Sequence, residues 1–174
     1  MITIIEDTRQ QTGRHELKHE YFERKDINVV RSKLPAGDYA LLTDMSRVVD
    51  TKQDLQEVYS NLIQDHERFR READFCKEHG IKLTILVEEP GIYRLDDVRR
   101  WKNPRMRRYE KIKEMHSHGK WKKIPEKKPP VNGEQLWKIM YTFSERHGCR
   151  FRFCSPKSAG RTVMYLLTGE DYGE

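Results

Sequence analysis

The chain has 174 residues, of which 34 are Lys or Arg and 28 are Asp or Glu, so its formal net charge is +6. This length suits one domain, and a hydrophobic content of 36% with 10% aromatic residues excludes a disordered tail. No apolar stretch approaches the ~20 residues that a membrane span requires, and the first residues lack a signal-peptide pattern. We therefore expect a soluble cytoplasmic protein with no membrane partner.

The predicted elements follow from the spacing of apolar residues along the chain. Leu17, Tyr21 and Phe22 fall at helical spacing between two short apolar runs, and the polar break after residue 42 predicts a hairpin of adjacent strands. The expected strands are 2–6, 27–30, 38–42, 47–52, 81–89 and 149–154, and the expected helices are 13–26, 54–76, 133–148 and 158–167. This order predicts a single α/β domain with a mixed sheet.

The cysteine content indicates a reducing compartment. Cys76, Cys149 and Cys154 are odd in number and too few for a disulfide framework. They also lack the paired spacing of a zinc site. We expect all three to lie in the core.

Positive charge is concentrated in residues 99–132, which we call the basic insertion. Residues 99–128 hold thirteen Lys or Arg and three Glu, a local charge of +10 that leaves −4 for the rest of the chain. Apolar periodicity is lacking from about 102 to 132, so we expect a flexible arm that binds a polyanion, with a solvated loop as the alternative. Aromatic residues among the charges could stack on unpaired bases or pack against the body. The predicted DNA contacts are Arg99, Arg100, Lys102, Arg105, Arg107, Arg108, Lys111, Lys113, Lys120, Trp121, Lys122 and Lys123, with Arg68 of the 54–76 helix.

Polar residues at the ends of two adjacent predicted strands are the candidates for chemistry. Asp38 begins one strand, and Asp50, Thr51 and Lys52 end the next. Since strand side chains alternate, Asp50 and Lys52 point to one face, where they can approach Asp38. Two carboxylates and the Thr51 carbonyl suit a hard cation such as Mg²⁺, which would polarise a phosphoryl oxygen and lower the pKa of a bound water. Lys52 would then orient that water or offset charge on the phosphate.

Three segments together resemble a known nuclease family. They are residues 4–10, residues 34–39, and residues 48–52 followed by Asp54 and Leu55. In this order they resemble the nuclease domain of XPF-type structure-specific endonucleases, within the PD-(D/E)xK superfamily, and especially the stand-alone version of bacteriophages and prophages. The resemblance covers residues 1 to about 90 well and residues 133–167 more loosely.

The resemblance implies a single nuclease domain over residues 1–174, with a restriction-endonuclease-like mixed sheet flanked by helices. It implies Mg²⁺- or Mn²⁺-dependent cleavage of DNA, with Asp7, Asp38, Asp50 and Lys52 at the catalytic positions and Arg9 in support. Asp7 would join Asp38, Asp50 and Thr51 at the metal. The family usually has Asp-x-Arg-Glu and Glu-Arg-Lys where this chain has residues 7–10 and 50–52. A homodimer through residues 133–167 is implied as well.

Three functions remain open at this point. The first is a metal-dependent DNA endonuclease acting on branched or flapped DNA in phage replication, recombination or repair. The second is a non-catalytic DNA-binding pseudonuclease, which Gln10 and Thr51 favour because they depart from the family pattern. The third is a protein-interaction module that uses the basic insertion on a protein or RNA.

Overall fold

A mixed six-stranded sheet forms the centre of the molecule. The computed structural model describes residues 2–10, 13, 15–120, 122–124 and 128–173. The strand order is β2-β1-β3-β4-β5-β6, in which β3 is antiparallel to β1 and β4 and the other neighbours are parallel. The predicted mixed sheet and hairpin are therefore confirmed. The bounds are β1 (Ile2–Asp7), β2 (Ile27–Ser32), β3 (Tyr39–Leu41), β4 (Arg47–Lys52), β5 (Lys82–Val87) and β6 (Arg150–Phe153).

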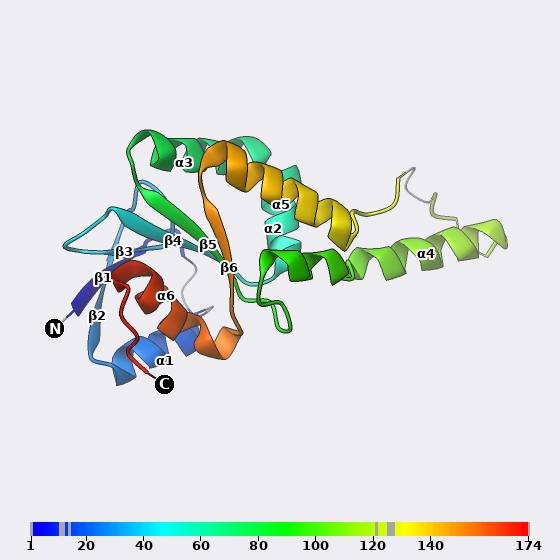
Figure 1. Ribbon diagram of the computed structural model, residues 1–174. Coiled ribbons are helices and arrows are strands. Elements are labelled where there is room, and N and C mark those ends of the chain that lie inside the picture. The colour runs from blue at the N-terminus through cyan, green and yellow to red at the C-terminus, as the bar shows by residue number, and fades with distance from the viewer. Residues whose placement is uncertain (1, 11–12, 14, 121, 125–127, 174) are drawn as a thin grey trace.

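Helices cover both faces of the sheet (Figure 1). Alternate residues of β4 separate the two cores: Val48 packs with α2, α3 and α5, and Val49 packs with α1 and α6. This alternation is expected for a sheet that is buried on both sides. The helices are α1 (Glu16–Arg24), α2 (Leu55–Ile63), α3 (His66–Glu78), α4 (Pro104–Ser117), α5 (Gly133–His147) and α6 (Ala159–Thr168), with short 3₁₀ turns η1 (Leu95–Arg100) and η2 (Pro156–Ser158).

The single helix expected over residues 54–76 is wrong, because two helices, α2 and α3, occupy this part of the chain. The N–H groups of Gln64 and Asp65 both donate to the carbonyl of Ser60, at 2.8 and 3.1 Å, so the regular ladder ends there. Neither Gly nor Pro marks the break. Apolar spacing continues across it, and periodicity alone therefore could not reveal it.

Two smaller expectations had different outcomes. In α1 the buried residues are Lys18, Tyr21 and Phe22, whereas Leu17 is exposed, contrary to the predicted apolar face. Lys18 is buried because its ammonium pairs with Glu88 at the end of β5. All three cysteines are buried and free, as expected.

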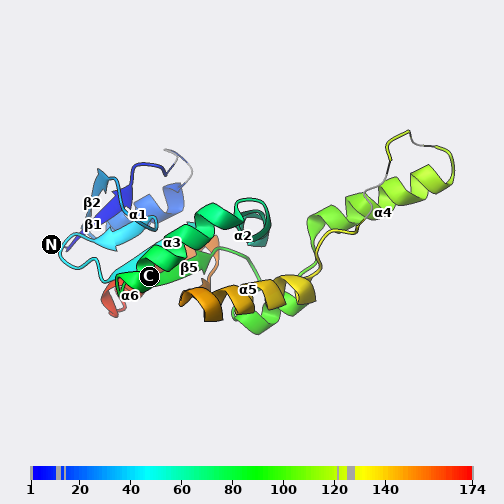
Figure 2. The ribbon, with the colours of Figure 1, turned by 90° about the horizontal axis from the view of Figure 1, so that it is seen from above.

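The basic insertion contains a helix, α4, which corrects the expected flexible loop. Pro104 occupies the first turn, where its missing N–H is tolerated, and the Asn103 side chain accepts a hydrogen bond from the N–H of Arg105 at 3.0 Å. Every third residue of α4 is half-buried and the others are exposed. The half-buried residues are Met106, Tyr109, Ile112 and Met115. Figure 1 and Figure 2 both show α4 projecting from the body.

The two ends of the insertion are fixed at one place on the body. Asn103 Nδ2 donates to the carbonyl of Val131 at 2.7 Å, joining the start of α4 to the segment just before α5. Gly133 opens α5 against the backbone of η1, where an added Cβ would lie 2.4 Å from the Val98 carbonyl oxygen. The arm therefore begins and ends at a single packed joint. Within the described ranges, none of the helices has the length and apolar character needed to cross a membrane.

Candidate active site

The register of β1, β3 and β4 brings the predicted site together. Tyr39 lies opposite Val49, and the N–H of Asp38 donates to the Val49 carbonyl at 2.8 Å. The carbonyl of Asp38 in turn accepts the N–H of Asp7 at 2.8 Å. Asp38 is thereby held next to Asp50, where β4 approaches its carboxyl end.

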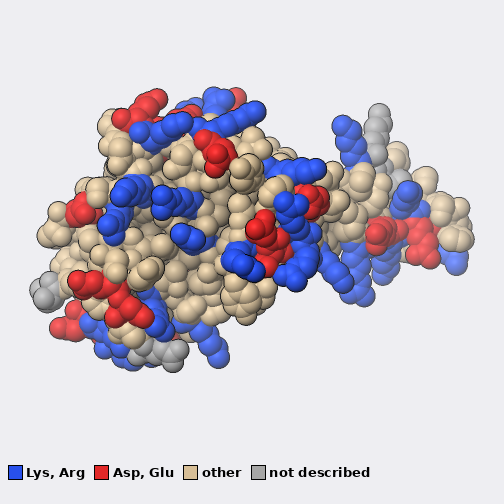
Figure 3. Space-filling view, viewed as in Figure 1, with Lys and Arg blue, Asp and Glu red and all other residues tan. Residues whose placement is uncertain are grey.

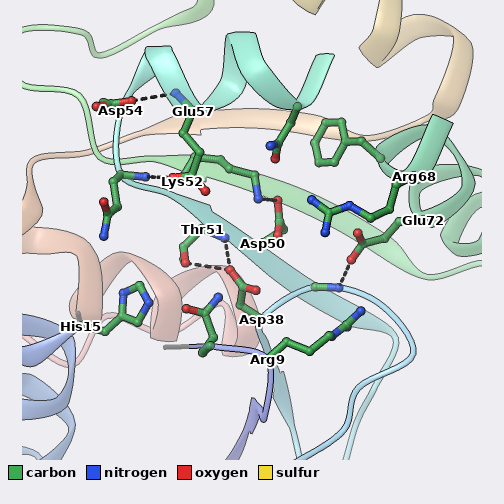
Figure 4. Close-up of a pocket in the computed structure, with 15 residues that line it drawn as sticks. Arg9, His15, Asp38, Asp50, Thr51, Lys52, Asp54, Glu57, Arg68 and Glu72 are labelled. Carbon is green, nitrogen blue, oxygen red and sulfur yellow. Dashed lines mark hydrogen bonds and ion pairs between the residues drawn. The ribbon is translucent and has the colours of Figure 1, made fainter. Parts of the chain in front are cut away.

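These residues line a cavity of about 540 Å³ (Figure 4). Its walls come from the β1–α1 segment, the turn before β3, the end of β4, and helices α2 and α3. Of the predicted site residues, it brings together Arg9, Asp38, Asp50, Thr51, Lys52 and Arg68.

Asp38 is oriented by Thr51. Its Oδ2 accepts a hydrogen bond from the Thr51 N–H at 2.7 Å and another from the Thr51 hydroxyl at 2.8 Å. Both donors bind the same carboxylate oxygen, so Oδ1 receives neither of these bonds. The position where the family usually has Arg therefore serves here to hold a carboxylate.

Asp50 and Lys52 form a buried ion pair. Lys52 Nζ lies 2.7 Å from Asp50 Oδ2, as a close charge contact rather than an aligned hydrogen bond. Burial raises the pKa of Asp50 to about 7, the carboxylates of Asp38 and Glu72 act in the same direction, and the Lys52 ammonium opposes them. For Lys52, burial favours the neutral form, but the charges of Asp50 and Asp38 outweigh it and raise its pKa. The Lys52 ammonium also lies 5.5 Å from the centre of the Phe69 ring, on α3.

The donor set fits a hard cation that shares its coordination with substrate. Among the described residues, no group of three or more His, Cys, Asp or Glu side chains is arranged to hold a metal by itself. Mg²⁺ commonly uses one or two carboxylates, with phosphate and water in its other positions. Asp38 and Asp50 supply two carboxylates. The pKa of Asp50 is raised mainly by burial and further by the nearby carboxylates of Asp38 and Glu72, whose negative charge a cation would offset.

Asp7 does not line this cavity. Its carboxylate is buried and accepts hydrogen bonds from the backbone and guanidinium of Arg9 and, at 2.7 Å, from the N–H of Leu34. Burial alone would raise the pKa of Asp7, but these hydrogen bonds outweigh it and lower the pKa. The structure thus places Asp7 behind the cavity, where it holds Arg9 and the segment that leads to Asp38.

Glu72 and His15 are among the cavity residues that the sequence analysis did not identify. Glu72 of α3 accepts the N–H of Gly37 at 2.6 Å and so fixes the turn that presents Asp38. Gly37 has φ +69°, a left-handed conformation that favours glycine. Glu72 follows Arg68 by four residues, and this spacing on one helix face is the signal that could have found it. His15 also lines the cavity, and burial lowers its pKa.

The predicted DNA contacts of the basic insertion are dispersed. Arg99 pairs with Glu134 at 2.8 Å and lies over the Trp137 ring, and Arg100 pairs with Asp97 at 2.7 Å, so both form ion pairs with the body although both remain exposed. Trp121 lies outside the described residues. The remaining cations are exposed along the arm, namely Lys102, Arg105, Arg107, Arg108, Lys111, Lys113, Lys120, Lys122 and Lys123.

The base of the arm lies beside the cavity. The Arg105 guanidinium lies 5.6 Å from the centre of the Tyr59 ring on α2, and Glu57 of the same helix lines the cavity. A polyanion bound along α4 would therefore approach the site at its α2 side.

Comparison with known proteins supports a nuclease fold. The ERCC4 domain matches residues 7–160. Among solved structures, XPF from Aeropyrum pernix is similar, with 17% identity over 94% of this chain and a TM-score of 0.57. XPF from Aeropyrum pernix in complex with DNA has 18% identity over 96% of this chain and a TM-score of 0.60. The chain spans 62% and 64% of those two chains. A comparison with curated proteins gives no match.

The family match covers most of the chain, including the turn before β3, strand β4 and helices α2 and α3, from which the cavity is built. The structural likeness extends over the same sheet and helices. The chain therefore belongs to the ERCC4-domain family and has the fold of an XPF-type nuclease domain.

Proposed function

We propose that this chain is a divalent-metal-dependent DNA endonuclease that hydrolyses phosphodiester bonds, with Mg²⁺ or Mn²⁺ as its cofactor. The observation that supports this most is the convergence of Asp38, Asp50 and Lys52 on one open cavity. Membership of the ERCC4-domain family supports the same chemistry.

Each residue has a distinct part in the proposed reaction. Asp38 and Asp50 would hold the cation, which supplies Lewis-acid activation of the phosphodiester when it is bound. Thr51 keeps the Asp38 carboxylate oriented through its two hydrogen bonds. The Lys52 ammonium, fixed by Asp50, would stabilise negative charge that develops on the phosphate in the transition state.

The proposed substrate is branched or flapped DNA, held mainly through backbone phosphates. The exposed cations of α4, whose base lies beside the cavity, support a DNA partner. The solved XPF structure in complex with DNA agrees with this partner. A role in phage replication, recombination or repair, and a homodimer through residues 133–167, remain predictions from the family resemblance.

The test is cleavage of labelled flap, fork and linear DNA with and without Mg²⁺ or Mn²⁺, by the parent protein and by Asp50→Asn. This change keeps the side-chain shape and removes a formal charge from the metal site. We expect cation-dependent products from the parent and their loss in Asp50→Asn, with circular dichroism showing that the variant is folded. Glu20→Gln alters an exposed carboxylate of α1 outside the cavity and is the matched control.

The same assay separates the alternatives. DNA binding without cleavage under every metal condition would indicate a pseudonuclease. Neither binding nor cleavage would indicate a protein-interaction module. Undiminished turnover by Asp50→Asn at the same metal concentration would remove Asp50 from the mechanism.

A further inference from the structure

A second hollow, of about 480 Å³, lies at the other end of the strands from the candidate active site. It is formed where β4, β5 and β6 begin, whereas Asp50 and Lys52 lie where β4 ends. The two sites also use different faces of the sheet. Lys52 points toward Phe69 on α3. Arg47 lies on the opposite face of β4, because it is two residues from Val49, which packs with α6.

The lining of this hollow is strongly positive. It contains five cationic side chains, Arg47, Lys77, Lys82, Arg150 and Arg152, and no Asp or Glu. Figure 3 shows Lys and Arg side chains gathered over the open part of the sheet between α6 and the layer of α3 and α5. Lys77 donates to the carbonyl of Arg146 at 2.7 Å. Within the described part of the chain, none of the other four forms an ion pair with a carboxylate.

The negative carboxyl ends of nearby helices offset only a fraction of this positive charge. The carboxyl ends of α3, α5 and α6 lie at the hollow, as Gly80, Gly148 and Gly169 show. Each helix end is equivalent to about −0.5 charge, so the three together offset about 1.5 of the five positive charges. Lys77, Lys82, Arg150 and Arg152 are exposed, so the remaining positive charge is available to an anionic ligand.

The cations are arranged along a diagonal of the sheet. Arg47 pairs in register with Lys82, Arg150 pairs with Thr84, and Arg152 pairs with Leu86. Two strand spacings give a width of about 10 Å, and four residues along a strand give a length of about 13 Å. A line of positive charges of this size suits successive phosphates of one nucleic-acid strand.

An exposed aromatic ring at the hollow indicates that its ligand is a single-stranded nucleic acid. Tyr165 of α6 lines the hollow and is 54% exposed, although it is a large side chain. Surfaces that bind single strands combine cations that track the backbone with aromatic rings on which bases stack. A duplex instead offers its bases through grooves, which require a projecting helix or ribbon. The hollow has no such projection.

We infer that this hollow, which we call the rear basic surface, binds the phosphodiester backbone of a single-stranded DNA segment. A protein with two separate DNA-binding surfaces can hold two arms of one branched molecule. The inference concerns binding by the monomer, because Arg150, Arg152 and Tyr165 lie within residues 133–167 of the predicted homodimer. It does not depend on cleavage by the proposed active site.

The test is a binding titration with labelled 20-nucleotide single strands and duplexes over a series of salt concentrations, without divalent metal. The variant combines Lys82→Gln, Arg150→Gln and Arg152→Gln, which are all exposed positions. Each phosphate contact on a single strand contributes about 0.7 to the slope of log affinity against log salt. Three lost contacts should therefore flatten the single-strand slope by about 2 and weaken binding at least tenfold.

A matched control removes the same charge elsewhere. Arg70→Gln, Lys138→Gln and Arg146→Gln together change exposed cations of α3 and α5 that line a different groove. This control should leave affinity within about twofold of the parent. Equal losses in the two triple variants would attribute the effect to net charge and overturn the inference, as would no loss in either.

Further measurements address the ligand. Tyr165→Ala should weaken single-strand binding about tenfold and duplex binding little; an equal loss with duplex would overturn the single-strand assignment. If the triple variant does not fold, Arg152→Gln alone should still flatten the slope by about 0.7. Loss of binding to phosphatidylserine vesicles with unchanged DNA binding would instead identify a membrane contact. Because the assay reads binding without metal, a cleavage-inactive protein would leave its outcome intact.

Discussion

The Thr51 hydroxyl and backbone N–H both donate to the same oxygen of Asp38, at 2.8 and 2.7 Å. Thr51 stands where the family usually has Arg, and its position inside β4 makes it the neighbour of both Asp50 and Lys52. The relation shows how a departure from the family pattern retains a function at the site, which is to fix the direction of a carboxylate.

The first prediction concerns this hydroxyl. Thr51→Val keeps the shape of the side chain and removes one of the two hydrogen bonds, so we expect a tenfold or greater loss of single-turnover cleavage from a folded protein. A hydrogen bond to a charged group typically contributes about 1.5–3 kcal/mol, which corresponds to this range. Thr51→Ser retains the donor and should cleave close to the parental rate. Equal rates for the Val and Ser variants would show that the backbone N–H is sufficient.

The second prediction concerns Lys52. Lys52→Met removes the ammonium while keeping a long side chain against Phe69. We expect cleavage at saturating metal to fall by about 100-fold, as for other groups that stabilise transition-state charge. Calorimetry should show that metal binding is not weakened, since an ammonium is not a metal ligand. Weaker metal binding by this variant would contradict the proposal that Lys52 stabilises the transition state without taking part in metal binding. Lys33→Met, at an exposed position outside the cavity, is the control.

The third prediction concerns the arm. Replacing Arg105, Arg107, Arg108, Lys120, Lys122 and Lys123 by Gln should weaken duplex binding and flatten its salt dependence. Each phosphate contact contributes about −0.9 to the slope, so four to six contacts give a change of about 4 to 5. Metal binding should persist, because the carboxylates lie on β4 and the turn before β3. An unchanged affinity and slope would exclude the arm as the main DNA contact.

The fourth prediction concerns pH and Asp7. The folded state lowers the pKa of this buried carboxyl, through hydrogen bonds from Arg9 and Leu34 that outweigh the effect of burial. A depressed pKa stabilises the fold above the ordinary pKa near 4, and this stabilisation is lost as pH falls through the lower folded-state value. Asp7→Asn should therefore unfold more easily at pH 7, by about 2 kcal/mol.

The same variant should approach the parent in stability as pH falls toward 3. Urea unfolding at pH 7, 5, 4 and 3 would measure this difference. A gap that stays constant across the series would show that the charge of Asp7 contributes nothing. Asp65→Asn, which alters an exposed aspartate, should show little difference at any pH.

The extent to which the site could be predicted depends on how local its determinants are. The sequence predicts the meeting of Asp38 with Asp50 and Lys52, because a hairpin register and the alternation of side chains fix it. The position of Glu72 beside Gly37 depends on how α3 packs across the sheet. The position of Asp7 depends on a turn that buries its carboxylate against the N–H of Leu34. The four-residue spacing from Arg68 places Glu72 on the same face of α3, but the partners of Glu72 and Asp7 cannot be read from the residues next to them in the sequence.

Helix boundaries show the same limit. The break between α2 and α3 is made by hydrogen bonds to Ser60 without a Gly or Pro, so the apolar period runs through it. The helix of the arm was missed because its half-buried row repeats every third residue and contacts no large core. Period-based prediction is most reliable where a full helix face packs on a sheet.

Because the two ends of the arm are joined at Asn103 and Val131, the arm can rotate about a single point on the body. α4 has 14 residues, and its length is therefore about 21 Å. A rotation of about 10° at the pivot would displace the far end of the helix by about 4 Å while leaving its base almost in place. Small changes in the packing of Gly133 against η1 would thus reset where the tip of the arm meets a bound molecule, without moving the two carboxylates of the cavity.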